Sequence, residues 1–86
     1  MNWLAIQEHG LVASERVLAV GRAEAAAMKR LIQMAPPDRL INLTGGRKRR
    51  TILVLDSGHV IVTALSLPRL AALLAEAESV IHLQKR

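Results

Sequence analysis

The stretch from Thr51 to Leu65 reads TILVLDSGHVIVTAL and decides the fold. Its first five residues are nearly all aliphatic, which is typical of a strand that is buried on both faces. Asp56-Ser57-Gly58 follows as a tight connection, and Gly58 suits a left-handed backbone because it has no Cβ to clash there. His59 to Leu65 then returns as the partner strand. The stretch therefore predicts a buried β-hairpin.

Four more short strands are predicted outside this hairpin, at residues 3–6, 11–13, 16–20 and 40–43. From Ala23 to Met34, strong helix formers place apolar residues three and four positions apart, and Pro36-Pro37 ends this amphipathic helix. A second amphipathic helix is predicted over 68–81, because Pro68 suits a first helical turn. Its apolar stripe consists of Leu70, Leu73, Leu74, Ala77, Val80 and Ile81. The pattern predicts an α+β fold: a small antiparallel sheet with two amphipathic helices, in a single domain over 1–86.

Length and composition limit how such a domain is stabilised. A chain of 86 residues buries only about two thirds of the surface that its unfolded form exposes. The sequence has no cysteine, so disulfides are excluded, and His9, His59 and His82 lack the close spacing of a zinc site. Self-association is the remaining way to bury more apolar surface.

Trp3 is the only aromatic residue, since Phe and Tyr are absent. Single-stranded nucleic acid is usually held by bases that stack on aromatic side chains. If the protein binds nucleic acid, the backbone of a duplex is therefore the favoured target.

The formal net charge is +5, and the positive charges are concentrated. Between Arg39 and Leu55 there are five basic residues and no acidic one. Four of the five are consecutive, in Arg47-Lys48-Arg49-Arg50. A positive field focused at one point of the fold predicts a polyanionic partner.

The segment Thr44-Gly45-Gly46 joins this basic run to the strand before it. Two glycines let the backbone turn sharply and approach a phosphate closely. In an extended chain the side chains alternate, so Arg47 and Arg49 should point one way, and Lys48 and Arg50 the other. A basic run of four is weakly specific, and composition alone leaves two interpretations equally open, a phosphate-binding loop and a solvated charge run.

Secretion and membrane insertion are not indicated. The N-terminus lacks a long apolar run with a cleavage site, and about 18 uninterrupted apolar residues occur nowhere. We therefore expect a cytoplasmic protein with no membrane partner. The helix over 68–81 carries Glu76 and Glu78 on its polar face, the wrong charge for anionic lipid, so core packing or a subunit contact is the better interpretation.

Asp56, Ser57 and His59 are the residue types of a nucleophilic triad. Neighbours on one hairpin are not expected to converge as nucleophile, base and orienting acid, so we expect Asp56 and Ser57 to accept backbone hydrogen bonds in the turn. No Walker-type phosphate loop, dinucleotide fingerprint or metal-ligand cluster is present. We expect no catalytic residue, metal site, cofactor or small-molecule substrate, and thus no enzyme.

Three further basic residues lie outside the loop. Arg16 follows Glu15, and on composition alone it pairs with a neighbouring acid, an exposed contact that contributes little. Lys29 and Arg30 lie on the outward face of the first helix, where they are solvated by default. They form a secondary basic spot.

Five short pieces of the chain follow the order and spacing of one known family. They are Ser14-Glu15-Arg16, Met28-Lys29-Arg30-Leu31-Ile32-Gln33, Leu40-Ile41-Asn42, Gly46-Arg47-Lys48 and Asp56-Ser57-Gly58-His59-Val60. From about Ile6 to Leu70 the chain resembles RemA, the family of bacterial extracellular matrix regulators. The ordered set is far more specific than any single piece. The resemblance implies a small DNA-binding transcription regulator whose subunits close into a ring, with arginines on the rim that engage DNA.

Carried over residue by residue, the family's paired arginines after glycine fall on Arg47 and Lys48, and the arginine after the second strand's turn falls on Arg16. Lys48 keeps the charge but loses the guanidinium fork, which weakens a guanine contact more than a phosphate contact. Arg49 stands where the family more often has threonine, and adds a phosphate contact. The resemblance thus implies DNA contacts by Arg16, Arg47, Lys48 and Arg49, with secondary contacts by Lys29, Arg30 and Arg50.

The chain departs from the family pattern at two places. Gln7-Glu8-His9-Gly10 replaces a glycine-rich segment, and Ala27 replaces a proline. These departures affect loop geometry and ring size more than the basic loop. Two alternatives stay open: an RNA-binding protein that uses the same loop on A-form backbone, and a scaffold whose loop contacts an acidic protein partner.

Overall fold

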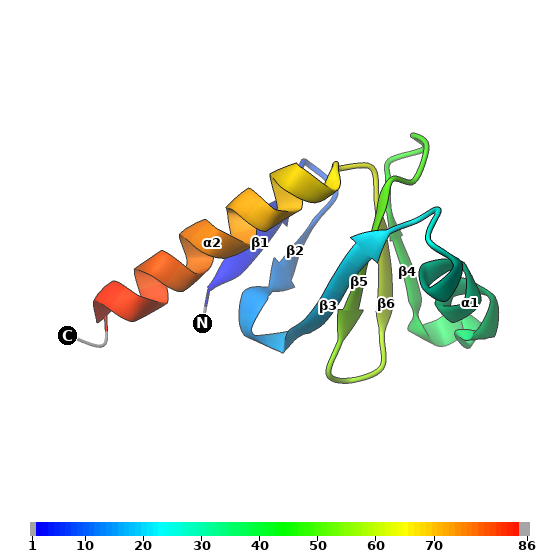
Figure 1. Cartoon of the computed structure of the whole chain (residues 1–86), viewed down its shortest axis with the longest axis horizontal. Coiled ribbons are helices and arrows are strands. Elements are labelled where there is room, and N and C mark those ends of the chain that lie inside the picture. Colours follow the sequence, from blue (N-terminus) through cyan, green and yellow to red (C-terminus); the bar gives the residue numbers. More distant parts are fainter. Residues whose placement is uncertain (1, 85–86) are drawn as a thin grey trace.

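The computed structural model describes residues 2–84, and their side chains over residues 2–77. These residues form two helices and six strands, with two short 3₁₀ turns between them (Figure 1). The elements are β1 (Trp3–Ile6), β2 (Gly10–Ala13), η1 (Ser14–Arg16), β3 (Val17–Arg22), α1 (Ala26–Met34), η2 (Pro37–Arg39), β4 (Leu40–Leu43), β5 (Thr51–Leu55), β6 (Val60–Thr63) and α2 (Leu67–Gln84). In this described part, no helix is long and apolar enough to cross a membrane.

The central sheet is mixed, with the strand order β3-β5-β6-β4. β5 runs antiparallel to β3 and β6, whereas β4 runs parallel to β6. β1 and β2 form a separate two-stranded antiparallel sheet. The α+β class and the two helices are confirmed, but the prediction of one antiparallel sheet was wrong, because β4 pairs with β6 in parallel and the β1–β2 hairpin stays apart.

β5 takes an inner position in the sheet because its aliphatic residues need burial on both faces. Ile52 and Leu53 are fully buried and belong to different core clusters, one on each face of the sheet. β4 exposes Ile41 and Asn42 and lies at the sheet's edge. Since β6 lies between β4 and β5, the connection 44–50 crosses the end of β6 and does not close a hairpin. This crossing places the basic run at the end of the sheet where β3, β4 and β6 end and β5 begins.

The predicted boundaries hold for β1, β4 and β5 and shift elsewhere. The strand predicted to begin at Arg16 begins one residue later, because residues 14–16 form the turn η1. The helix predicted from Ala23 begins at Ala26, because the backbone first turns and the Ala25 N–H bonds to the Arg22 carbonyl. The strand predicted over 59–65 is shortened to Val60–Thr63, and α2 begins at Leu67 and continues past 81.

Apolar side chains cover both faces of the central sheet. Leu53 and Ile61 face the β1–β2 hairpin and α2, from which Leu4 and Leu70 are fully buried against them. Ile52 and Val62 face α1 on the other side. Figure 1 shows this arrangement, with α1 on one side of the sheet and β1, β2 and α2 on the other. The core is therefore aliphatic, as the composition requires.

A buried polar pair holds the end of β6. Thr51 and Thr63 lie opposite each other across β5 and β6, and neither is exposed to solvent. Thr51 Oγ1 donates to the Leu65 carbonyl at 2.8 Å, so the hydrogen bond of 2.7 Å between the two hydroxyls is donated by Thr63. These bonds fix the segment that leads from β6 into α2.

We predict that Thr51→Val destabilises the fold by about 1–3 kcal/mol, because it leaves both the Thr63 hydroxyl and the Leu65 carbonyl without their partner in a buried site. Thr63→Val is the matched control. It keeps the bond to Leu65 and should cost less. Urea unfolding of the two variants measures the difference, and equal costs would contradict the inferred direction of the hydroxyl bond.

Candidate nucleic-acid interface

The basic loop, residues 44–50, begins with a tight turn over Thr44–Arg47. Gly45 and Gly46 have φ angles of +64° and +85°, as the two central residues of a type I′ turn require. The Arg47 N–H donates to the Thr44 carbonyl at 3.2 Å and closes the turn. Arg47 is the last residue of this turn and directly follows the two glycines.

Asn42 and Thr44 brace the start of this turn. Asn42 Oδ1 accepts hydrogen bonds from the Thr44 backbone N–H at 2.9 Å and from its hydroxyl at 2.7 Å. Thr44 Oγ1 in turn accepts one from the Gly46 N–H at 3.3 Å. Thr44 is buried as a result, so the entry to the loop is held in place.

The β1–β2 turn packs against the same loop. The His9 ring lies against Gly45, and a Cβ on Gly45 would collide with it. Gly46 has open space where its Cβ would stand. His9 belongs to the segment that replaces the family's glycine-rich run, so the substituted segment supports the geometry of the loop.

We predict that Gly45→Ala destabilises the protein more than Gly46→Ala. Both variants place a side chain on a left-handed backbone, which costs about 1–2 kcal/mol, but only Gly45→Ala also collides with His9. Thermal unfolding of the two variants measures the difference. His9→Ala in the Gly45→Ala background should recover the part due to the collision, and equal destabilisation by the two alanines would contradict the packing described.

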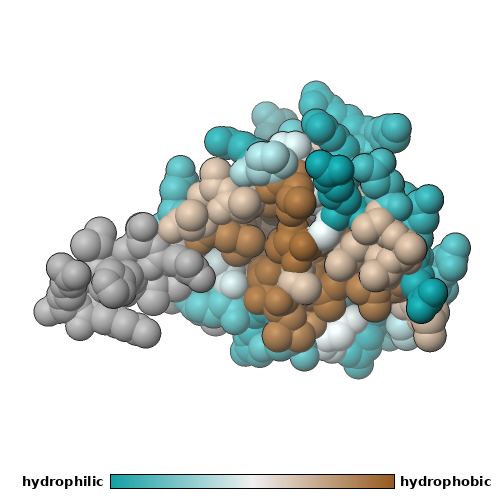
Figure 2. All heavy atoms as spheres, in the orientation of Figure 1, coloured by the Kyte–Doolittle hydropathy of each residue, from teal (hydrophilic) through white to brown (hydrophobic). Residues whose placement is uncertain are grey.

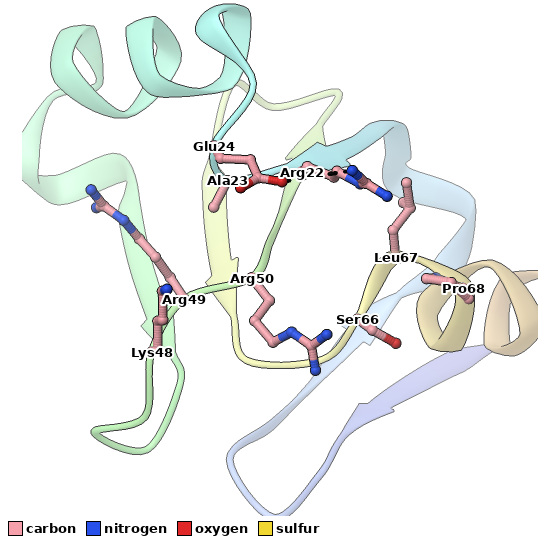
Figure 3. Close-up of a pocket in the computed structure, with 9 residues that line it drawn as sticks. All are labelled: Arg22, Ala23, Glu24, Lys48, Arg49, Arg50, Ser66, Leu67 and Pro68. Carbon is pink, nitrogen blue, oxygen red and sulfur yellow. Dashed lines mark ion pairs between the residues drawn. The ribbon is translucent and has the colours of Figure 1, made fainter.

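The exit of the loop is anchored by backbone hydrogen bonds. The Arg50 N–H donates to the Thr63 carbonyl at 2.8 Å, and the Ala23 N–H donates to the Arg50 carbonyl at 3.0 Å. The ends of β3 and β6 therefore meet the start of β5 at Arg50. Figure 3 shows the side chains of Arg49 and Arg50 extending in opposite directions, as extended chain requires.

Six of the seven predicted site residues fall into two groups. Arg47, Lys48, Arg49 and Arg50 are all exposed on the one loop, which gathers four positive charges. Lys29 and Arg30 are exposed on α1. The structure brings the four loop residues together at one end of the sheet.

Arg16 lies apart from the loop. Its carbonyl accepts the Asp56 N–H at 2.8 Å, and its guanidinium lies 3.6 Å from the Asp56 carboxylate. Its acidic neighbour is therefore Asp56 and not Glu15. Asp56 follows Arg50 by six residues along β5, which places Arg16 about 20 Å from the loop at about 3.3 Å per residue.

Sequence reasoning missed Arg22. It ends β3 opposite Thr51, and it lines a hollow of about 390 Å³ together with Lys48, Arg49 and Arg50 (Figure 3). Nothing in its local sequence marks it. The signal lies in strand pairing, because only the register of β3 on β5 places Arg22 beside the basic loop.

In the β5–β6 turn, Asp56 and Ser57 do not make the hydrogen bonds that the sequence predicted. Ser57 Oγ lies 2.6 Å from His59 Nδ1, so these two neighbours do meet. Asp56 does not complete a triad, because its carboxylate lies beside Arg16. The turn is closed by backbone hydrogen bonds, not by the side chains of Asp56 or Ser57 as expected, and Gly58 has the predicted left-handed φ of +89°.

No group of three or more potential metal ligands occurs among the residues that the structure describes. The fold and the loop together define a small α+β protein that presents a compact basic surface at one end of a mixed sheet. The family model described as RemA-like, Extracellular matrix regulatory protein A-like, matches residues 4–74. The chain belongs to this family, as its resemblance to RemA predicted.

Relatives of similar length occur in several bacteria. A protein of Finegoldia magna is 39% identical over 66 residues, which cover 76% of this chain and 80% of the relative. A protein of Dictyoglomus turgidum is 41% identical over 73 residues, covering 84% and 86%, and one of Heliobacterium modesticaldum is 40% identical over 74 residues, covering 84% and 80%. Each of the three carries the name "Putative regulatory protein".

Proposed function

We propose that this protein is a homo-oligomeric regulator of transcription or chromosome structure in the cytoplasm, and that it binds duplex DNA through the loop Arg47–Arg50. The observation that carries the proposal is the exposure of four consecutive cations on a loop anchored at both ends. An anchored loop has lost much of its conformational freedom before binding, so less affinity is spent on ordering it. The names of the relatives, which describe regulators, agree with a binding role and not an enzymatic one.

The loop residues have different roles in this proposal. Arg47 follows the turn directly, and its planar fork suits two oxygens of a phosphate or the edge of a guanine. Lys48 acts as a point charge on a phosphate. Arg49 adds a further phosphate contact, and Lys29 and Arg30 of α1 are secondary contacts.

Arg16 can contact DNA only if the bound duplex extends well beyond the loop. Because it lies about 20 Å from the loop of its own subunit, it cannot share a phosphate with Arg47. We assign it to DNA that passes from the loop of one subunit to a neighbouring subunit. Its ion pair with Asp56 is exposed and therefore exchanges readily for a phosphate.

Exposed apolar side chains support the assembly of subunits. Leu18 lies on the outer strand β3 and Ile41 on the outer strand β4, so each edge of the central sheet exposes a large apolar side chain (Figure 1). Leu31 and Met34 are exposed on α1, and Trp3 and Leu11 on the β1–β2 hairpin. Different surfaces on opposite edges pair head to tail, and such contacts close into a ring where the rotation permits.

The face seen in Figure 2 separates these two kinds of surface. Brown apolar atoms cover its middle, and teal polar atoms occupy the top of the view, where the loop 44–50 stands in Figure 1. Contacts between subunits through apolar surface therefore leave the basic loops free. The ring would then present one loop from each subunit.

We predict a solution mass several times 9.4 kDa by light scattering on a size-exclusion column. Leu18→Glu and Met34→Glu should each lower this mass, because each replaces an exposed apolar side chain by a charge. Gln33→Glu adds the same charge at an exposed polar position of α1 and serves as the control. A clean monomer of the parent at micromolar concentration would remove the ring from the proposal.

We predict that Arg47→Ala strongly weakens DNA binding, leaves the oligomer intact and makes binding less sensitive to salt. If Arg16, Arg47, Lys48 and Arg49 each met one phosphate, one subunit would give a log–log slope of about −3.6, or a loss of roughly 150-fold for a fourfold rise in salt. Several subunits on one duplex steepen the slope, and Arg47→Ala reduces it by about 0.9 for each engaged subunit. Fluorescence anisotropy of a labelled duplex measures both quantities.

Arg39→Ala is the charge-matched control, because the Arg39 side chain bonds to the Ser57 carbonyl at the opposite end of the sheet. It should change binding little. Lys48→Ala should weaken binding less than Arg47→Ala. A slope near zero, or parental binding by both loop variants, would reject the loop as a DNA site, and preferential binding of duplex RNA would favour the RNA alternative.

A further inference from the structure

A hollow of about 390 Å³ lies beside the basic loop and is lined by cationic side chains from separate segments. The end of β3 contributes Arg22 and Glu24 follows it, the loop contributes Lys48, Arg49 and Arg50, and Ser66 lies at the start of α2. Four basic residues therefore line the hollow, against a single acidic one.

Backbone pairing holds these segments in place around the hollow. Arg22 pairs across the strands with Thr51, and the Arg50 N–H bonds to the Thr63 carbonyl, three residues before Ser66. Figure 3 shows the side chains of Arg22 and Arg50 extending from two sides toward the segment of Ser66 and Leu67. Two guanidinium groups thus approach one region, one from the end of β3 and one from the loop.

The charges in the hollow are poorly balanced within the chain. Arg22 lies 3.6 Å from the Glu24 carboxylate, and both side chains are largely exposed, at 66% and 77%. An exposed pair of this kind is weak, so an anion can displace Glu24 from Arg22. Arg50 has no such acidic neighbour among the residues that line the hollow.

We infer that the hollow binds a phosphate group through Arg22 and Arg50, at a position distinct from Arg47 on the tip of the loop. Planar guanidinium groups bind phosphate oxygens through paired hydrogen bonds. Ser66, whose hydroxyl accepts the Arg69 N–H at 3.3 Å, stands on the same wall at the amino end of α2. The positive end of the helix dipole favours negative charge there. The inference goes beyond the proposed function, because it holds whether or not Arg47 meets DNA.

Two sources of the phosphate share this chemistry. The first is the DNA backbone, because the Cα atoms of Arg47 and Arg50 are at most about 11 Å apart, within about three phosphates of one strand along the helix axis. The second is a small phosphorylated molecule, since the volume lies within the range of small-ligand pockets. The experiment has one arm for each source.

The first arm is calorimetric titration of the full chain with pyrophosphate at constant ionic strength. Arg22→Gln and Arg50→Gln should each weaken binding by about tenfold or more, because each removes charged hydrogen bonds. Glu24→Gln should strengthen it by about 1.4- to 5-fold, because it removes the competing carboxylate. Arg39→Gln, far from the hollow, is the charge-matched control and should bind pyrophosphate as the parent does.

The second arm measures duplex binding by the same variants. If the phosphate belongs to DNA, pyrophosphate competes with the duplex, and Arg22→Gln reduces the salt slope by about 0.9 per engaged subunit. If it belongs to a small molecule, Arg22→Gln loses pyrophosphate and keeps the parent's affinity for the duplex. A parent that binds pyrophosphate but no duplex would reject the DNA proposal and leave the anion site standing.

Three outcomes would overturn the anion site. They are pyrophosphate binding no tighter than that of chloride, equal weakening by Arg39→Gln and Arg22→Gln, and weaker binding by Glu24→Gln. The last result keeps the inference testable even if Arg22→Gln fails to fold, because a purely structural role of the Arg22–Glu24 pair predicts no gain when the carboxylate is removed.

Discussion

The burial of β5 on both faces is the constraint on which the position of the basic loop depends. Ile52 and Leu53 point to opposite faces and are both fully buried, so β5 needs a strand on each side and a layer over each face. β3 and β6 fill the two neighbouring positions and displace β4 to the edge. The chain from β4 must then cross β6 to reach β5, and this crossing segment is the one that carries the four cations.

The crossing segment is anchored at both ends, so the backbone that carries its four cations is held in place. Arg50 is bonded through its backbone to both β3 and β6, and Thr44 is fixed by Asn42. Four positive charges on one short, fixed segment give this end of the sheet a locally positive potential.

The sequence predicted the elements of this fold better than their pairing. The aliphatic run Thr51–Leu55 and the glycine turns have local causes, and the structure agrees with them. The parallel pairing of β4 with β6 depends on competition among strands for the same neighbours, which a local pattern does not contain. Arg22 was missed for this reason, while the basic loop was found because its charges are contiguous.

The mixed sheet also bears on how several loops would act together. A head-to-tail contact between the β3 edge and the β4 edge relates neighbouring subunits by rotation, and in a closed ring a single rotation axis repeats every feature on the same side. In the proposed ring, contacts at the sheet edges leave the loops free, because each loop stands at the end of its sheet and not on an outer strand. Arg16 stands at the other end of β5, so a duplex that contacts both the loop and Arg16 must span the length of that strand.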